Sequence, residues 1–337
     1  MTSIRKFHFH CGSLLLAFTA VVTAAEPHPG VDDFLHELKA ETHADHASTQ
    51  RWKKLLAGAE FQPAIIAAIS KPAEASKTWQ QYRPIFLTEK RLHDGVAFWT
   101  EHRALLASIS AETGVAPEII VAIIGVETSY GRVTGNYRVL DALTTLAFYY
   151  PPRAAFFRKE LKTLLRQPST RFPVALDEIT GSYAGAMGSA QFMPSSYAEY
   201  ARDQDGDGRI DLWNSTADII ASVANYFVVH GWVSQAPIAE LATVADAAVL
   251  PELRGTEPVH SVATLAASGY QSSLPLDPNL PATLVQLAGA DGSETWITHR
   301  NFYVITRYNR SPMYAMAVFQ LSQQLTAAIA TPAAGAQ

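Results

Sequence analysis

The sequence predicts a mainly α-helical protein of the α+β class, and three features of the chain indicate this. From Asp32 to about Tyr150 the apolar residues recur at spacings of three and four, which is the period of an amphipathic helix. Residues 117–128 are strongly apolar, which is typical of a helix that is mostly buried. Residues 236–299 are less regular, so we expect a small mixed subdomain beside a larger helical part.

The bounds of the helices follow from the residues that start and stop them. Gly114 is a helix stop, and Pro117 stands where prolines open helices, because the first helical N–H lacks a partner in any case. Pro151-Pro152 separates two further helical segments. Apolar spacing marks earlier helices at Phe34, Leu35 and Leu38 and at Leu105, Leu106 and Ile109. The helices predicted with both ends are 117–128, 153–166, 195–201, 217–230 and 312–328.

Two segments break the helical pattern. Residues 172–194 contain closely spaced glycines, which predict a loop or a short extended segment. Loops of this kind often carry function. Thr283–Leu287 and Glu294–Thr298 flank Asp291-Gly292, which predicts a β-hairpin within the mixed subdomain.

The composition excludes several classes of protein. With 337 residues, 48% of them hydrophobic and 17% charged, the chain is long and apolar enough to bury a core. The 26 Lys and Arg residues are outnumbered by 31 Asp and Glu, so there is no global positive field to attract nucleic acid. Cys11 is the only cysteine, which excludes an internal disulfide and a cysteine-based metal site.

The first 25 residues have the pattern of a secretory signal peptide. Arg5 and Lys6 form a positive start, Leu14–Val22 is an apolar stretch too short to span a bilayer, and Thr23-Ala24-Ala25 is a small-residue cleavage signal. The residues before Cys11 do not form a lipidation box. We therefore expect an exported, soluble protein with no membrane span after cleavage, whose net charge falls from −5 to −7 (24 minus 31). The alternative is an uncleaved membrane anchor.

An acidic residue ends the apolar segment 117–128. Glu127 follows a run of Ile, Val, Ala and Gly, and burial among them would penalise the charged form of its carboxyl group. A carboxyl group that keeps its proton suits a general acid working near neutral pH. The alternative is a structural ion pair with Arg132, and this segment alone does not decide between the two.

Residues 182–197 form a second group of chemical interest. Small residues let the backbone approach a bulky ligand, while Gln191, Tyr183 and Tyr197 supply hydrogen-bonding and stacking groups of the kind that sugars favour. Together with the segment around Glu127, the pattern becomes specific. Glu127-Thr-Ser-Tyr-Gly-Arg, Gly185-Ala-Met-Gly and Gln191-Phe-Met-Pro-Ser-Ser resemble the signature of the lytic murein transglycosylase B family.

The resemblance covers most of the chain after the signal segment. It continues through Tyr82-Arg-Pro-Ile-Phe, Asp205-Gly-Asp-Gly, Asp211-Leu-Trp-Asn, Ser222-Val-Ala-Asn-Tyr-Phe, His230-Gly-Trp and Asn301-Phe-Tyr-Val-Ile-Thr-Arg-Tyr-Asn. There are two departures from the family pattern. Ser189-Ala190 replaces an aromatic–glycine pair, and Tyr130 stands where a tryptophan is common.

With this resemblance the chain divides into five parts. Residues 1–25 are the signal peptide, and 26–235 contain a lysozyme-like catalytic core with an extra helical domain. Residues 236–300 are the small mixed subdomain. Residues 301–330 return to the substrate groove, and 331–337 are a disordered tail.

The resemblance also implies an activity. The family cleaves the β-1,4 bond between MurNAc and GlcNAc in periplasmic peptidoglycan without water, which leaves 1,6-anhydromuramic ends. Glu127 matches the single catalytic acid and base, and Ser182 matches a serine that contacts the N-acetyl group of the reacting sugar or positions the intermediate. The residues that match the lining of the glycan groove are Gln191, Tyr82, Tyr226, Tyr308, Asn309 and Tyr314. For each tyrosine, ordinary packing is the alternative.

The presence of one acid fits this reaction. Inverting and retaining glycosidases place two carboxylates beside the bond, whereas neither motif here contains a second acid; Asp177 and Glu178 lie outside them and Asp141 is expected to be structural. A lyase-like reaction needs one acid, because the sugar's own 6-hydroxyl attacks. The alternatives are a hydrolytic muramidase and a non-catalytic peptidoglycan-binding module. Glycan strands are the expected partner, and the sequence leaves open which cell-wall synthase the enzyme accompanies.

An Asp-rich segment matches most of an EF-hand calcium loop. Oxygen ligands occupy loop positions one, three, five and nine, and glycine occupies position six, but position twelve is Asn214 instead of the usual Glu. The resemblance suggests Asp218 as the acid that closes the loop. The predicted structural calcium site is Asp203, Asp205, Asp207, Arg209, Asp211 and Asp218. The alternative is an Asp/Gly turn that caps a helix.

One other acidic and histidine-rich stretch could be drawn as a metal site. It contains Glu41, His43, Asp45 and His46, and we expect it to be the solvated face of an N-terminal helix. No glycine loop that would cradle a phosphate is present, and we expect no organic cofactor.

Overall fold

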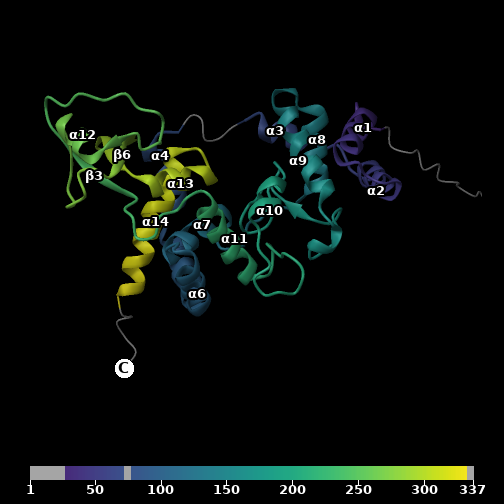
Figure 1. Cartoon of the computed structure of the whole chain (residues 1–337), viewed down its shortest axis with the longest axis horizontal. Coiled ribbons are helices and arrows are strands. Elements are labelled where there is room, and N and C mark those ends of the chain that lie inside the picture. The colour runs from purple at the N-terminus through teal and green to yellow at the C-terminus, as the bar shows by residue number, and fades with distance from the viewer. Residues whose placement is uncertain (1–26, 72–76, 332–337) are drawn as a thin grey trace, which may run out of the picture.

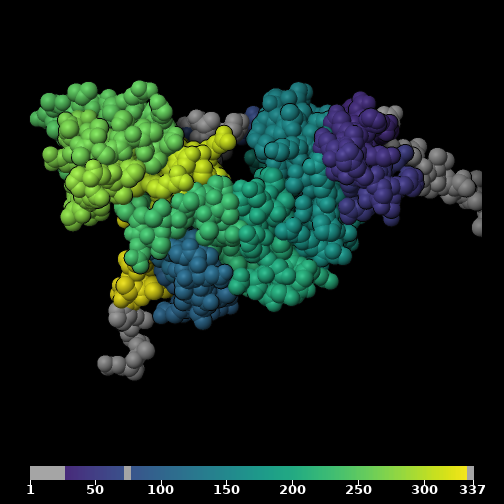
Figure 2. All heavy atoms as spheres, viewed as in Figure 1, coloured from purple at the N-terminus to yellow at the C-terminus, as the bar shows by residue number. Residues whose placement is uncertain are grey.

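The computed structural model describes residues 27–71 and 77–331. The predicted signal peptide lies outside the described residues, as does the predicted tail beyond Thr331. Figure 1 shows an elongated arrangement, with α1 and α2 at one end of the long axis and a small sheet with α12 at the other. Helices α7, α11 and α14 lie between them. Figure 2 shows the same two ends as separate lobes of the surface.

The N-terminal end is a unit of short helices. Its elements are α1 (Val31–Thr42), α2 (His46–Ala57), α3 (Pro63–Ile69), α8 (Val139–Tyr149) and α9 (Ala154–Arg166). Helices α8 and α9 pack against each other, and α2 and α3 both pack against α8. The buried residues of α1 are Phe34, Leu35 and Leu38, as their spacing predicts. This unit therefore forms by covering the apolar face of each helix with its neighbours.

The central part contains most of the remaining helices. They are α4 (Trp79–Phe86), α5 (Glu89–Glu101), α6 (Arg103–Thr113), α7 (Pro117–Thr128), α10 (Pro194–Tyr200), α11 (Thr216–Val229), α13 (Arg300–Tyr308) and α14 (Pro312–Ala330). Helix α7 is surrounded by α5, α6, α11 and α14. Eight consecutive residues from Ile119 to Val126 are buried, which explains why the helix is apolar on all sides. The predicted segment 117–128 is confirmed.

The remaining elements are short. They comprise the 3₁₀ turns η1 (Pro151–Arg153) and η2 (Ser169–Arg171) and a two-stranded sheet of β1 (Tyr137–Arg138) and β2 (Thr180–Gly181). The predicted break at 172–194 is therefore loop with one short strand. The predicted helices 153–166, 195–201, 217–230 and 312–328 are present, each shifted by two residues or fewer at either end.

The mixed subdomain is built on an antiparallel sheet with the strand order β4-β6-β7-β3-β5. Its elements are β3 (Ala239–Val244), β4 (His260–Ser261), α12 (Val262–Ala267), β5 (Tyr270–Ser272), β6 (Pro281–Gly289) and β7 (Gly292–Thr298). The predicted hairpin is confirmed as β6 and β7, which pair from Thr283 with Thr298 to Gly289 with Gly292. Its small core of Val262, Leu265, Tyr270, Ala282, Leu284 and Ile297 is separate from the main one. The exact bounds 236 and 300 stay a prediction.

The described ranges contain several apolar helices. No single helix there is both long and apolar enough to cross a membrane. Helices α6 and α7 reach that length and composition only when counted together, across a bend of 114°.

Candidate active site

Glu127 lies in the last turn of the buried helix α7. Its side chain is only half-buried, while the residues before it, Ile124 and Val126, are buried. The hydroxyl of Tyr314, near the start of α14, donates a hydrogen bond to Oε1 of Glu127 over 2.6 Å. Because α7 and α14 pack along each other, two residues 187 positions apart meet at this point. The acid at the end of the apolar segment is thus held in a fixed orientation.

Helix α7 ends immediately after Glu127 in an unusual backbone conformation. Ser129 and Tyr130 both have positive φ angles, 51° and 63°, which residues with a Cβ rarely adopt. The N–H groups of Ser129 and Tyr130 bond back to the carbonyls of Gly125 and Ile124 and so cap the helix. The ring of Tyr130 lies where a Cβ on Gly125 would be, 2.6 Å from its Cζ. The tyrosine that departs from the family pattern therefore packs on the last turn of α7, and its hydroxyl donates to the carbonyl of Arg91 at 3.0 Å.

The structure places Arg132 in an ion pair with Asp94, which lies on α5. Arg132 and Lys90 both hold the pKa of Asp94 below its ordinary value, chiefly through hydrogen bonds from Lys90. The carboxylate that Arg132 pairs with here is thus that of Asp94.

Two further tyrosines lie near Glu127. Burial raises the pKa of Tyr314 and of Tyr308 well above the ordinary value, and the charge of Glu127 raises both further. Tyr82, on α4, is buried and also raises the pKa of Tyr314. Both Tyr314 and Tyr308 therefore keep their protons and remain hydrogen-bond donors. Tyr308 uses its proton on the carbonyl of Ala190 at 2.7 Å.

The glycine-rich loop supplies Ser182 and Gln191. The Oγ of Ser182 accepts hydrogen bonds from the N–H groups of Ala186 at 3.1 Å and Ala184 at 3.3 Å. The amide of Gln191 donates to the carbonyls of Thr134 at 3.0 Å and Gly188 at 2.9 Å. Ser182 thus has its proton left to donate, and Gln191 has its carbonyl oxygen left to accept.

Contacts from three directions fix this loop. Thr128, next to Glu127, donates to the carbonyl of Ser189 at 3.1 Å, and Tyr308 bonds the next residue. A Cβ at Gly188 would lie 2.4 Å from the carbonyl oxygen of Leu212, so only glycine lets the loop pack this closely. On the far side, Glu160 of α9 accepts from both the N–H and the hydroxyl of Ser195, each at 2.8 Å.

Glu160 is a positioning residue that the sequence analysis missed. It is 2% exposed and caps the start of α10, which follows the Gln191 segment directly. A signal for it existed in the sequence. Glu160 shares the helix face of the buried residues Phe157, Leu161 and Leu164, where a carboxyl group needs a partner.

Two other predicted groove residues use their polar groups inside the protein. Tyr226, on α11, is 7% exposed and donates to the carbonyl of Arg307 at 2.6 Å. Its ring lies 4.6 Å from that of Tyr308. The side-chain oxygen of Asn309 accepts from the N–H of Ser311 at 3.0 Å. Tyr226 therefore packs behind the ring of Tyr308, which agrees with ordinary packing as the alternative role for this tyrosine.

Asp141 has the structural role expected for it. Its carboxylate accepts from the N–H of Glu60 at 2.9 Å and pairs with Arg138 at 3.0 Å. Burial raises its pKa above the ordinary value. The stretch around Glu41 is not one helix face as predicted, because it spans the end of α1 and the start of α2. Glu41 pairs with Lys162 and Arg166, and Asp45 caps α2 through the N–H of Ser48.

The Asp-rich loop brings together only part of the predicted ligand set. Carboxylate oxygens of Asp203, Asp205 and Asp218 lie within 4.8 Å of one another. Asp218 is 1% exposed, and burial raises its pKa, with smaller contributions from the charges of Asp205 and Asp203. The carboxylate of Asp207 instead accepts from the N–H of Arg209, and that of Asp211 from Trp213 and Asn214.

This fold and site define a lysozyme-like, mainly helical enzyme with the carboxyl group of Glu127 at its centre. The family model of the transglycosylase SLT domain matches residues 30–323. The chain is 45% identical over 261 residues to the membrane-bound lytic murein transglycosylase B of Escherichia coli K12, which covers 77% of this chain and 71% of that protein. The chain therefore belongs to the transglycosylase SLT domain family and is a lytic transglycosylase.

Solved structures show the same relationship. The soluble lytic transglycosylase SltB1 from Pseudomonas aeruginosa matches with a TM-score of 0.82 and 45% identity, covering 90% of this chain and 100% of that one. The Escherichia coli lytic transglycosylase Slt35 in complex with calcium matches with a TM-score of 0.80 and 40% identity, covering 90% of this chain and 95% of that one.

Proposed function

We propose that this chain cleaves the MurNAc–GlcNAc β-1,4 bond of peptidoglycan with Glu127 as its single acid and base, leaving 1,6-anhydromuramic ends. The observation that carries the proposal is the hydrogen bond from Tyr314 to Oε1 of Glu127. It holds the carboxyl group that would donate the proton in a fixed orientation at the end of α7. The names of the relatives, which are lytic transglycosylases, support the same reaction.

The reaction proceeds in two proton transfers. Glu127 first protonates the glycosidic oxygen, and the bond from that oxygen to C1 of MurNAc breaks. The resulting carboxylate then takes the proton of the 6-hydroxyl of the same MurNAc, whose oxygen forms the new bond to C1. Because the nucleophile is already part of the sugar, orientation supplies much of the rate. Glu127 ends the cycle protonated, so no second acid is needed.

Ser182 and Gln191 hold the sugar in this proposal. The Oγ of Ser182 already accepts two backbone N–H groups, so its proton points to an external acceptor such as the N-acetyl carbonyl of the reacting sugar. The carbonyl oxygen of Gln191 is suited to a sugar hydroxyl, since its amide protons are used within the loop. Tyr82, Tyr308 and Asn309 contribute the wall of the groove.

The acid is tested by a matched pair of substitutions on one helix. Glu127→Gln keeps the shape of the side chain but removes the proton, so sacculus lysis should fall by about 10²–10⁴-fold, as for a lost general acid. Glu118→Gln, in the first turn of α7, is the control and should leave lysis unchanged. Equal lysis by the two variants would contradict the proposal.

We also propose a structural calcium ion at Asp203, Asp205 and Asp218. Hard oxygen donors suit calcium, the three carboxylates converge, and a cation would offset the cost of burying Asp218. Slt35, a relative, has been solved in complex with calcium. Participation of the carboxylates of Asp207 and Asp211 requires the loop to exchange the hydrogen bonds described above, whereas Arg209 would bind through its backbone carbonyl oxygen.

Calcium binding is tested by thermal unfolding. An ion that binds only the folded chain stabilises it by about 2.7 kcal/mol at a hundredfold excess over Kd, so calcium should raise the Tm and a chelator should remove the effect. Asp203→Asn should abolish the shift, while Asp246→Asn, an exposed carboxylate elsewhere, should keep it. Identical melting curves with calcium and with chelator would leave the loop as a helix-capping turn.

The cellular location is part of the same proposal. We infer export to the periplasm by cleavage after Ala25, which the pattern of the first 25 residues supports. The Escherichia coli relative is described as membrane-bound. N-terminal sequencing of the mature protein from the native cell tests the cleavage, and recovery of residues before Glu26 would contradict it.

A further inference from the structure

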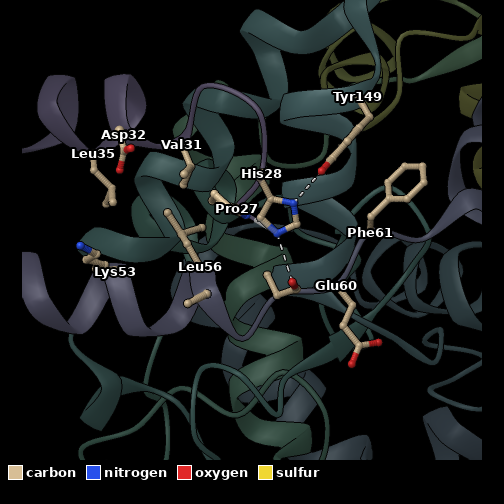
Figure 3. A pocket seen from close by; sticks show the side chains of 12 residues that line it. Pro27, His28, Val31, Asp32, Leu35, Lys53, Leu56, Glu60, Phe61 and Tyr149 are labelled. Carbon is tan, nitrogen blue, oxygen red and sulfur yellow. Dashed lines mark hydrogen bonds between the residues drawn. The ribbon is translucent and has the colours of Figure 1, made fainter. Parts of the chain in front are cut away.

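A cavity of about 450 Å³ lies in the N-terminal helical unit. Its walls come from α1, α2, the loop before α3 and the end of α8, and none of the proposed catalytic or groove residues lines it. Its volume falls within the range of roughly 300–1,000 Å³ that small-ligand sites occupy. Figure 3 shows Asp32 and Lys53 toward one side, Phe61 and Glu60 toward the other, and His28 between them.

The polar centre of the cavity is a fixed pair of side chains. His28 is 9% exposed; its Nε2 lies 3.1 Å from the carbonyl oxygen of Ala59 and its Nδ1 lies 3.0 Å from the hydroxyl of Tyr149 (Figure 3). Since a carbonyl only accepts, the tautomer with the proton on Nε2 satisfies both contacts, and Tyr149 then donates to Nδ1. The phenol oxygen of Tyr149 keeps lone pairs with which it can accept from a ligand.

An exposed aromatic ring forms one wall. Phe61 is 43% exposed, and its ring centre lies 4.4 Å from that of Tyr149, which holds it in place. Its exposed face at the cavity is a platform for the apolar side of another ring.

The rim consists mostly of hydrogen-bond acceptors. The exposed carboxylates of Asp32 and Glu60 and the phenol oxygen of Tyr149 accept, whereas Lys53 is the charged donor of the lining. A ligand that suits this rim carries several donors around a ring with an apolar face. Sugars have this chemistry, because hydroxyl groups surround a pyranose ring whose C–H bonds form an apolar surface.

We propose that this cavity is a second glycan-binding site, which holds a sugar of a peptidoglycan strand apart from the site of cleavage. The identity of the strand rests on the proposed function, while the sugar chemistry rests on the cavity itself. Two linked contacts with one polymer raise its overall affinity beyond that of either site. The helical unit would therefore keep the enzyme on the sacculus between cleavage events.

Binding to purified sacculi tests the proposal without turnover. The full chain carrying Glu127→Gln is the background, and cosedimentation gives its apparent Kd. Adding Phe61→Ala removes the platform and should weaken binding about 2- to 10-fold, the effect of one aromatic contact. Phe156→Ala is the control, since Phe156 is 37% exposed on α9 of the same unit but does not line the cavity.

A second variant and a competitor sharpen the test. Glu60→Ala removes a rim acceptor without adding a cation and should also weaken sacculus binding. Unchanged melting temperatures show that both variants fold. Peptide-free glycan strands should compete with the sacculi, and this competition should be reduced by Phe61→Ala. Equal binding of Phe61→Ala and Phe156→Ala, or competition by free stem peptides alone, would overturn the proposal. An inactive wild-type enzyme would instead contradict the proposed function.

Discussion

The hydrogen bond between Tyr314 and Glu127 should control turnover. Tyr314→Phe removes only the hydroxyl that donates to Oε1 over 2.6 Å, and keeps the buried ring. A hydrogen bond to a charged group contributes about 1.5–3 kcal/mol. The bond is strongest when Glu127 is a carboxylate, after it has donated its proton, so its loss should lower kcat more than it raises KM. At 1.4 kcal/mol per factor of ten, the expected fall is about 10- to 150-fold.

The assay is the rate of release of soluble muropeptides from purified sacculi, measured over a range of substrate concentrations. Tyr303→Phe makes the same chemical change on α13, where the ring of Tyr303 lies against Arg300 and Arg307, and serves as the control. It should keep wild-type kcat. A Tyr314→Phe enzyme with unchanged kcat and an unchanged Tm would refute the idea that Tyr314 supports Glu127 during turnover.

Further predictions concern the support of the site. Glu160→Ala leaves the N–H of Ser195 without its acceptor and should lower the free energy of unfolding by about 1–3 kcal/mol, measured by urea denaturation. A loss below about 0.5 kcal/mol, the least that such a bond contributes, would contradict this prediction. Gly188→Ala puts a Cβ 2.4 Å from the carbonyl oxygen of Leu212 at a φ of +64° and should destabilise the folded chain by at least about 1 kcal/mol. A variant with the Tm of the wild type would contradict this expectation. Burial raises the pKa of Asp141 above its unfolded value, so the folded chain binds the proton of this carboxyl group more tightly than the unfolded chain does. The stabilisation of the fold by this proton is complete at low pH and is lost as the pH rises through the raised pKa. The Tm of wild type relative to Asp141→Asn should therefore increase as pH is lowered from 7 toward about 4, and a difference that is constant over this range would refute it.

The part of the fold that the sequence predicts well is the part governed by continuous apolar periodicity. The segment 117–128 is apolar on every side and can only be a core helix, and the acid at its end is visible in the sequence as an exception. The hairpin at 283–298 was also predictable, because alternation and a turn dipeptide agree. Helix α12 and strands β3 and β5 were missed, since elements of three to six residues have no period long enough to recognise.

Contacts between distant residues could not be predicted from local pattern. The bond from Tyr314 to Glu127 and the cap of Ser195 by Glu160 each depend on how two helices pack. The positive φ angles of Ser129 and Tyr130 have no sequence signal, because the usual marker of that conformation is glycine. The resemblance to a family placed Tyr314 in the groove, but its role as the partner of the acid comes from the geometry.

In the proposed reaction the sugar's own 6-hydroxyl, and not water, attacks C1 once Glu127 has protonated the leaving oxygen. Mass spectrometry of muropeptides released from sacculi in ¹⁸O-labelled water tests it most directly. Attack by the 6-hydroxyl predicts products that are one water lighter than hydrolytic ones, with 1,6-anhydro ends and no ¹⁸O at C1. Reducing muramic ends that carry the label, as the main product, would contradict the account and make the enzyme a muramidase.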